Sequence, residues 1–228
     1  MKLLKLFMLS FVIVMMLAGA LMAQDKTMNT EDGMRFVVND SKMLDNVTFK
    51  SYAPLEDIVG FTSEISGYLV FDPFNPKKGG HGVLDVPITG LTTGIPLRDE
   101  HMQSAGWLDA EKFPNASLRI NSLKDIKEVK SSNESASYDL TVVAEFTLHG
   151  ITKVLEFPGR ITYLKESEAT QRRMPGNLLA ARASFTVALK DFAVNGPEGM
   201  AIVGSKVGET IDIEVSIMGS TMAKLSEN

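Results

Sequence analysis

Three histidines and one arginine–aspartate pair offer the widest choice of chemistry in this sequence. His81, His101 and His149 could bind a metal ion or move a proton. Arg98 and Asp99 could hold an anion or form a catalytic pair. The histidines lie far apart, no two of them have a recognised ligand spacing, and the chain has no cysteine. The sequence therefore predicts no metal site and no cofactor.

Structural roles explain these residues better than catalysis does. Arg98 and Asp99 are adjacent, and adjacent residues on a helix point to different sides. We expect Arg98 to donate to loop carbonyls and Asp99 to cap a short helical turn. His149, which precedes Gly150, is expected to bind backbone in a turn. The chain has no Gly-x-Ser-x-Gly elbow, phosphate-binding glycine loop or paired-carboxylate motif in a recognisable frame, so the prediction is a protein without enzymatic activity.

Strand-like alternation of apolar and polar residues is the dominant pattern along the chain. The clearest run spans residues 138–148, where every second residue is apolar. Shorter segments of this kind occupy residues 35–38, 47–50, 65–71, 83–88, 117–122, 154–157, 159–164, 183–189 and 210–217. Eight or more strands with little helical pattern predict an all-β, antiparallel fold. The pattern alone allows either a closed barrel or a sandwich.

One long segment interrupts the strands. Residues 82–114 begin as a strand and continue as a polar, glycine-containing excursion with helical spacing. An excursion of about twenty residues usually has structure of its own, so we expect a short helix there. Trp107, the single tryptophan, could line a pocket or anchor this excursion to the sheet.

Three segments in this order resemble the motifs of the YceI-like family. They are residues 67–73 (GYLVFDP), residues 93–114 with Arg98-Asp99 and His101, and residues 148–153 (LHGITK). The resemblance runs from about residue 35 to residue 217. It implies an eight-stranded, lipocalin-like β-barrel that binds polyisoprenoid lipids. A polar loop at residues 166–177, with Arg172-Arg173, departs from the family pattern and could alter the mouth of a barrel.

The first residues have the order of a targeting segment. Lys2 and Lys5 precede an apolar run at residues 6–17, and small residues follow at 18–23. This order predicts a signal peptide cut between residues 20 and 23, with a periplasmic mature protein; the alternative is an uncleaved membrane anchor. The predicted organisation is a signal peptide at 1–23, a spacer at 24–33, one YceI-like lipid-binding domain at 34–220 and a tail at 221–228.

The charge balance excludes some partners. The chain has 23 basic and 28 acidic side chains, and loss of Lys2 and Lys5 makes it more acidic still. A nucleic-acid ligand needs a basic face, and attachment to anionic lipid head groups needs one too. We therefore expect no nucleic-acid partner, no membrane span after processing, and apolar contact with any lipid.

An apolar interior could be a packed core or a ligand tunnel, and the pattern of residues allows both. The family resemblance implies a tunnel that takes a long apolar chain, such as a polyisoprenoid. The alternatives are an enzyme acting on a small apolar molecule, to which His101, His149 or Arg98 would contribute, or a structural or stress-related module with a filled core. A homodimer is also possible. The structural motif residues are Arg98, Asp99, His149 and Gly150. The candidate lining residues are Phe49, Leu69, Phe71, Leu84, Val86, Ile88, Leu118, Ile120, Tyr138, Leu140, Val142, Phe146 and Phe185.

Overall fold

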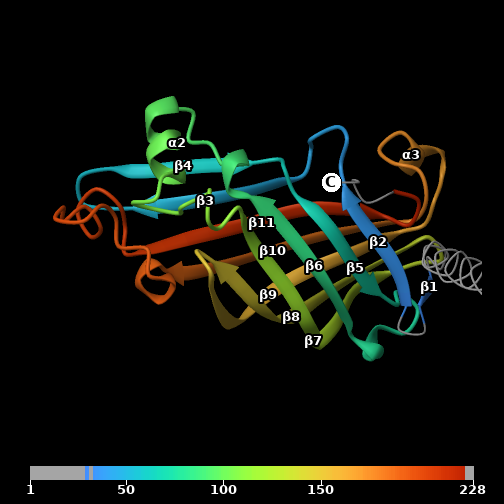
Figure 1. Ribbon diagram of the computed structural model, residues 1–228. Coiled ribbons are helices and arrows are strands. Elements are labelled where there is room, and N and C mark those ends of the chain that lie inside the picture. The colour runs from blue at the N-terminus through green and yellow to red at the C-terminus, as the bar shows by residue number, and fades with distance from the viewer. Residues whose placement is uncertain (1–28, 31–32, 224–228) are drawn as a thin grey trace, which may run out of the picture.

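The computed structural model describes residues 29–30 and 33–223, which form an antiparallel β-barrel (Figure 1). The predicted signal peptide, most of the predicted spacer and the last five residues of the predicted tail lie outside the described residues. The strands are β1 (Asn29–Thr30), β2 (Gly33–Asn39), β3 (Asn46–Tyr52), β4 (Asp57–Thr62), β5 (Ser66–Phe71), β6 (Gly80–Pro87), β7 (Asn115–Ser131), β8 (Ser135–Leu148), β9 (Ile151–Leu164), β10 (Leu178–Ala188) and β11 (Thr210–Ser220). The helices are η1 (Pro76–Lys78), η2 (Ile88–Gly90), α2 (Pro96–Gln103), α3 (Glu168–Gln171) and η3 (Leu189–Phe192).

Eight strands close the barrel. They follow the order β2, β5, β6, β7, β8, β9, β10 and β11, and the pairing of Ser220 with Val37 joins β11 back to β2. The predicted eight-stranded antiparallel barrel with a short helical excursion is therefore confirmed. Closure leaves no free sheet edge along most of the wall.

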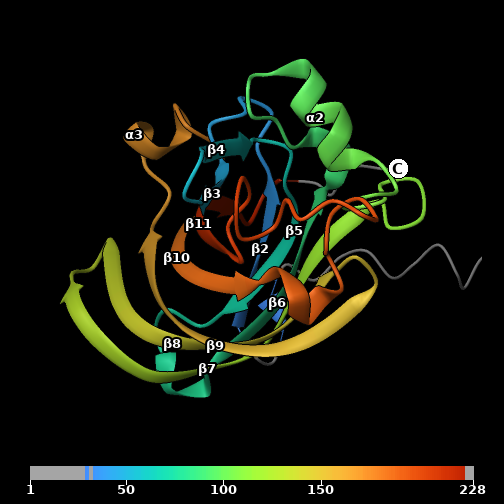
Figure 2. The ribbon, with the colours of Figure 1, turned by 90° about the vertical axis from the view of Figure 1, so that its left-hand side faces the viewer.

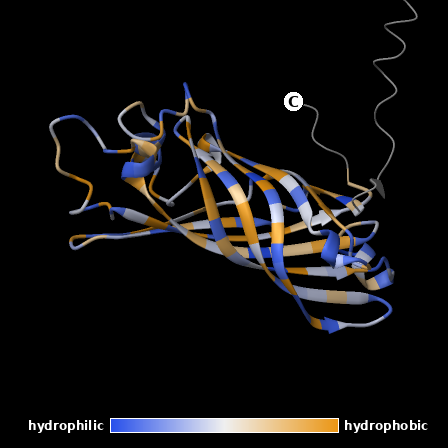
Figure 3. Cartoon of the chain, turned by 90° about the horizontal axis from the view of Figure 1, so that it is seen from below, coloured by the Kyte–Doolittle hydropathy of each residue, from blue (hydrophilic) through white to orange (hydrophobic). Residues whose placement is uncertain are grey.

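The barrel wall follows the period-two pattern of the sequence. Residues of β8 alternate between buried and half-buried over the whole strand, and Ala144 at its centre is fully buried. Figure 3 shows the matching bands of apolar and polar residues along neighbouring strands. Because successive side chains of a strand point to opposite faces, one face of each strand lines the interior.

Strand β11 changes partner along its length. Its first half, from Ile211 to Ser216, pairs with β3, whereas its last residue pairs with β2. The hairpin of β3 and β4 therefore stands between β11 and the chain that follows β6, where Phe61 bridges to Thr92. This hairpin therefore extends the wall at one end of the barrel.

The structure corrects three details of the strand assignment. Strand β4 was not expected, and the separate segments 154–157 and 159–164 are one strand, β9, which runs through Pro158. Ile88, expected at the end of a strand, lies in η2 and is buried. Helices α2 and α3 lie at opposite ends of the molecule (Figure 1), and we call these the α2 end and the α3 end.

Candidate functional site

An apolar cavity of about 360 Å³, the main cavity, lies inside the barrel at the α2 end. Strands β3, β4, β6, β7, β8, β10 and β11 supply its wall, and α2 and residues 193–209 also contribute. Figure 2 looks onto this end, where the segment before β11 crosses the barrel with α2 above it. The volume lies near the lower end of the range of about 300–1,000 Å³ typical of ligand pockets.

Two breaks in the regular strand pairing accompany this cavity. The β3–β4 hairpin replaces β2 as the neighbour of β11. On the other side, the pairing of β9 with β10 ends where Gly159 lies opposite Ala183. Pro158, the residue of β9 just before Gly159, has no partner in β10. Proline has no N–H to donate, so it suits a strand segment that has lost one neighbour. The wall at the α2 end is therefore held by fewer strand pairs than the rest of the barrel.

A small cavity of about 60 Å³ lies further inside the barrel. It shares the lining residues Leu84, Leu118 and Val215 with the main cavity. Phe185 lines the main cavity and stacks on Phe157 of the small cavity at 4.6 Å between ring centroids. Side chains alone thus separate the two spaces, and a chain too long for the first would have to displace them.

The charged side chains that line the main cavity come from α2, the hairpin tip and the segment before β11. Arg98 of α2 forms an ion pair with Glu56 at the tip of the β3–β4 hairpin, and both side chains border the cavity. His101, one turn along α2, and Lys206 lie on the same border. Sequence reasoning expected Arg98 to bind loop carbonyls, whereas its partner in the structure is a carboxylate. The ion pair connects the helix to the hairpin across the opening.

Asp99 fixes the turn from which α2 starts. Its carboxylate accepts hydrogen bonds from the Thr92 hydroxyl at 2.6 Å, the Thr93 N–H at 2.7 Å and the Thr93 hydroxyl at 2.6 Å. Burial opposes ionisation of Asp99, but these hydrogen bonds outweigh it and lower its pKa. The N-cap position itself is Ile95, so Asp99 holds the preceding turn rather than capping the helix.

His149 and Gly150 form the two-residue turn between β8 and β9. Both have positive φ, at 51° and 75°, which matches the twist of a tight hairpin. A side chain at Gly150 would collide with the Phe113 ring, which also lies edge-on to His149 at 4.8 Å. His149 Nδ1 lies 3.1 Å from the Phe192 carbonyl oxygen. The backbone contact expected for His149 exists, but it ties this turn to η3.

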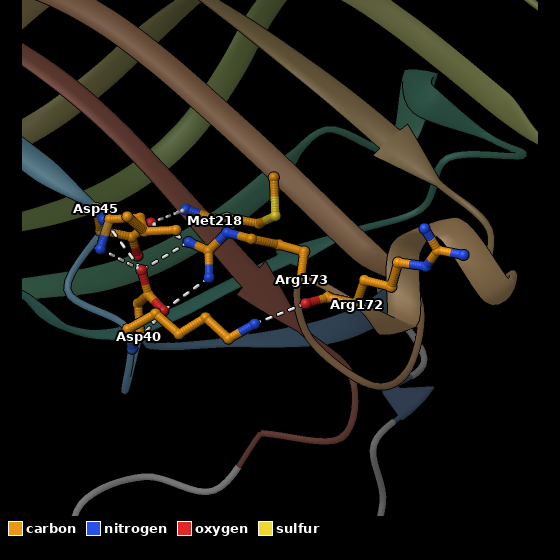
Figure 4. A network of polar contacts seen from close by, with 7 residues as sticks. Asp40, Asp45, Arg172, Arg173 and Met218 are labelled. Carbon is orange, nitrogen blue, oxygen red and sulfur yellow. Dashed lines mark hydrogen bonds and ion pairs between the residues drawn. The ribbon is translucent and has the colours of Figure 1, made fainter.

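An ionic cluster with two buried carboxylates occupies the α3 end (Figure 4). Arg173, in the polar loop 166–177, donates to both oxygens of Asp40, at 2.7 and 2.6 Å, and to Asp45 at 3.3 Å. Asp45 also accepts from the Met218 N–H at 3.0 Å, while its second oxygen is buried without a partner. The loop that departs from the family pattern is thus tied to the seam where β11 meets β2.

The two carboxyls of this cluster have opposite pKa shifts. Burial would raise the pKa of Asp40, but hydrogen bonds from Arg173 and from the Lys42 and Leu44 N–H groups lower it to about 2. For Asp45, burial dominates and raises the pKa to about 6; the Met218 hydrogen bond opposes that shift and the charge of Asp40 adds to it. Arg173 thus stabilises the charged form of Asp40, but it does not offset the cost of burying a charge on Asp45.

Eleven of the thirteen candidate lining residues border a cavity. Ile88 and Tyr138 do not: Ile88 is buried in η2, and the Tyr138 hydroxyl donates to the Pro73 carbonyl at 2.8 Å. The main cavity is bordered by Phe49, Val86, Phe146 and Phe185, the small cavity by Leu69, Phe71, Ile120, Leu140 and Val142, and both by Leu84 and Leu118.

Sequence reasoning missed the outer border of the main cavity. Glu56 comes from the tip of the unexpected hairpin, Ile58 comes from its strand β4, and Ile202 and Lys206 come from the segment before β11. The β-branched and aromatic run at residues 58–62 was the available signal for β4. Trp107, for which two roles were open, lines the cavity. Among the described residues, no group of three or more histidine, aspartate or glutamate side chains could hold a metal ion.

Comparison with known proteins gives one consistent family. The model of the YceI-like domain matches residues 39–218. A UPF0312 protein of Pseudomonas fluorescens is 27% identical over 202 residues, which cover 89% of each chain. A UPF0312 protein of Pseudomonas putida is 27% identical over 162 residues, 71% of this chain and 73% of the relative.

Solved structures show the same fold. Burkholderia cenocepacia BcnA superposes with a TM-score of 0.58 at 14% identity, covering 79% of this chain and 99% of its own. A polyisoprenoid-binding domain from Saccharophagus degradans, implicated in plant cell wall breakdown, also gives 0.58, at 10% identity, covering 81% and 97%. None of the helices in the described part of the present chain is long and apolar enough to cross a membrane.

Proposed function

The chain belongs to the YceI-like domain family, and from that premise we propose that it binds the apolar chain of a lipid, polyisoprenoid in type, in the main cavity. The observation that carries this proposal is the cavity of about 360 Å³, whose wall is mostly apolar and whose charged side chains come from α2, the hairpin tip and the segment before β11. A polyisoprenoid-binding domain with the same fold supports the choice of ligand.

Burial of an apolar chain supplies enough free energy without a specific polar contact. Each methylene removed from water contributes about 0.8 kcal/mol, so a five-carbon isoprene unit contributes about 4 kcal/mol. Aromatic side chains such as Phe49, Phe146 and Phe185 line the space that the chain would occupy. Affinity would therefore rise with chain length until the main cavity is full.

The cavity volume suggests how the ligand is selected. A tail of a few isoprene units fits the scale of the main cavity, and a longer tail must enter the small cavity or leave its end outside. A polar head group would lie between Arg98, His101 and Lys206 at the outer border, where it remains hydrated.

We also propose that the protein acts after export, in the periplasm. The basic, apolar and small-residue order of residues 1–23 supports this location. Mass spectrometry of the exported protein should show loss of at least the first 20 residues. Membrane-bound protein that retains Met1 would favour the anchor instead.

Extraction of lipids from protein purified without detergent tests the proposed function. Mass spectrometry of the extract should show an apolar chain in a fixed ratio to the protein. Delipidated protein should take up isoprenoid alcohols added in solution, with a change in the emission of Trp107, the single tryptophan, on the cavity wall. Protein that carries no lipid and takes up none would contradict the proposal.

A further inference from the structure

Large apolar side chains are exposed around the opening of the main cavity. We call six of them the apolar rim: Leu55, Val59, Phe61, Ile95, Leu97 and Met200. Leu55 at the hairpin tip is 72% exposed and Leu97 of α2 is 62% exposed. Isolated exposed apolar residues are ordinary on protein surfaces, but a group around one opening marks an interaction site.

Specific contacts hold the three elements of the apolar rim together. The ion pair of Arg98 with Glu56 joins α2 to the hairpin tip, and these residues adjoin Leu97 and Leu55 in sequence. The Leu55 N–H donates to the Ser205 carbonyl at 3.1 Å, which joins the tip to the segment that carries Met200. Phe61 is bridged to Thr92, just before Ile95.

The apolar rim continues into the cavity wall. On β4, Ile58 lines the main cavity while its neighbour Val59 is 52% exposed, so this strand has apolar side chains on both faces. The segment before β11 repeats this pattern, because Ile202 lines the cavity and Met200 is 61% exposed. Apolar side chains therefore lie on both the inner and the outer side of the elements that surround the opening.

The geometry points to a lipid bilayer as the partner of this surface: we propose that the apolar rim inserts into the interfacial region of a membrane and opens the cavity toward the acyl chains. A lipid tail could then pass between membrane and protein without crossing water. The purpose of this docking rests on the proposed lipid-binding function, but the surface itself does not.

Charge at the apolar rim favours an uncharged membrane surface. Arg98 and Glu56 neutralise each other, while Asp57 and Glu100 are exposed acidic neighbours and Lys206 is an exposed base. The chain as a whole carries a formal net charge of −5. Attraction to anionic lipids therefore contributes little, and apolar insertion must dominate.

Flotation with phosphatidylcholine vesicles tests the docking directly. The delipidated parent should partition onto the vesicles, and the double substitution Leu55→Ser with Leu97→Ser should weaken this partition by about tenfold or more. Leu44→Ser provides the matched control, because Leu44 is 64% exposed at the α3 end and borders neither cavity. Circular dichroism should show that all variants are folded.

Titration of the same variants with a short isoprenoid alcohol separates docking from ligand binding. The Leu55→Ser, Leu97→Ser variant should keep the Trp107 response of the parent in solution while it loses partition. A parent that binds the alcohol but does not float with vesicles would overturn the docking proposal alone. Equal losses in the rim variant and the Leu44→Ser control would also overturn it. So would a parent that sediments as a homodimer and a rim variant that sediments as a monomer, because the rim would then be a subunit interface.

Discussion

The two ends of the barrel are held together in different ways. At the α3 end, Arg173 connects the loop of α3 to the buried Asp40 and Asp45 at the seam between β2 and β11. At the α2 end, the Arg98–Glu56 ion pair lies between partly exposed side chains, and behind it is an apolar cavity rather than a core. The α3 end depends on one ionic cluster with two buried carboxylates, and the α2 end depends on connections between surface elements around a cavity.

This difference predicts where substitutions cost stability and where they cost binding. A buried charge that loses its partner is strongly destabilising, whereas an ion pair near the surface contributes little. Side chains that border an empty space can grow at small cost, whereas side chains in a filled interior cannot. Changes at the α3 end should therefore alter stability, and changes in the main cavity should alter ligand affinity.

The largest effect is expected for Arg173→Ala. This change leaves Asp40 and Asp45 buried without their cation, so we expect the free energy of unfolding to fall by about 3 kcal/mol, the lower end of the range for broken buried pairs. Urea unfolding measures it. Arg160→Ala is the matched control, since Arg160 also binds an aspartate, Asp139, through two hydrogen bonds but on the barrel surface, and its effect should be small. Similar losses in the two variants would refute a special role for the α3 end.

Two enlarging substitutions compare the filled and open parts of the interior. Val142→Phe adds a ring to the small cavity of about 60 Å³ and should cost about 1–3 kcal/mol of stability through overpacking. Ala116→Phe adds a ring to the wall of the main cavity and should change the stability of delipidated protein less. Thermal unfolding of both variants without lipid makes the comparison. A larger loss for Ala116→Phe would mean that the main cavity is a packed core.

A smaller, pH-dependent effect is expected for Asp45→Asn. The pKa of Asp45 in the folded protein, about 6, lies above its unfolded value of 3.8, so folding takes up a proton between these values. The contribution of Asp45 to the stability of the fold is therefore most favourable below pH 4. That contribution weakens as pH rises from about 4 to 6. Asp40, with a folded pKa of about 2, stabilises above pH 4 and loses that effect as pH falls toward 2.

Removal of the Asp45 carboxyl should therefore flatten the stability profile between pH 4 and 6. At pH 7, Asp45→Asn should equal the parent or exceed it by up to about 2 kcal/mol after allowance for solvent screening. Asparagine can still accept from the Met218 N–H, so the geometry is preserved. Chemical unfolding from pH 3 to 8 measures the slope. If stability changed with pH equally in the variant and the parent, a group other than Asp45 would be titrating between pH 4 and 6.

Local patterns were sufficient to predict much of the fold. The run of every second apolar residue at 138–148 became the alternating face of β8, and the excursion after residue 82 became η2 and α2. The eight-stranded closure came from the family resemblance, because alternation alone suits a sandwich equally well. Pairing of β11 with two different strands depends on contacts far apart in sequence, which local periodicity does not contain.

The candidate site was predictable for its walls but not for its opening. Apolar strand residues such as Phe146 and Phe185 were named because the period of two places each of them on the apolar face of its own strand. The partner of Arg98 could not be named, because Glu56 lies in a hairpin that the pattern did not reveal. Arg173 was singled out only as part of an unusual loop, since its carboxylate partners lie 133 and 128 residues away in the sequence.

The central claim is that the main cavity holds an apolar chain, and a chain-length titration tests it most directly. Isoprenoid alcohols of increasing length should be titrated into delipidated parent, Ala116→Phe and Val142→Phe proteins, with Trp107 emission as the readout. Affinity for the parent should rise with length and then level off. The affinity of Ala116→Phe should stop rising at a shorter chain length than that of the parent. Folded Val142→Phe should bind short chains as the parent does. Affinity that is independent of chain length and unchanged by Ala116→Phe would contradict binding in this cavity.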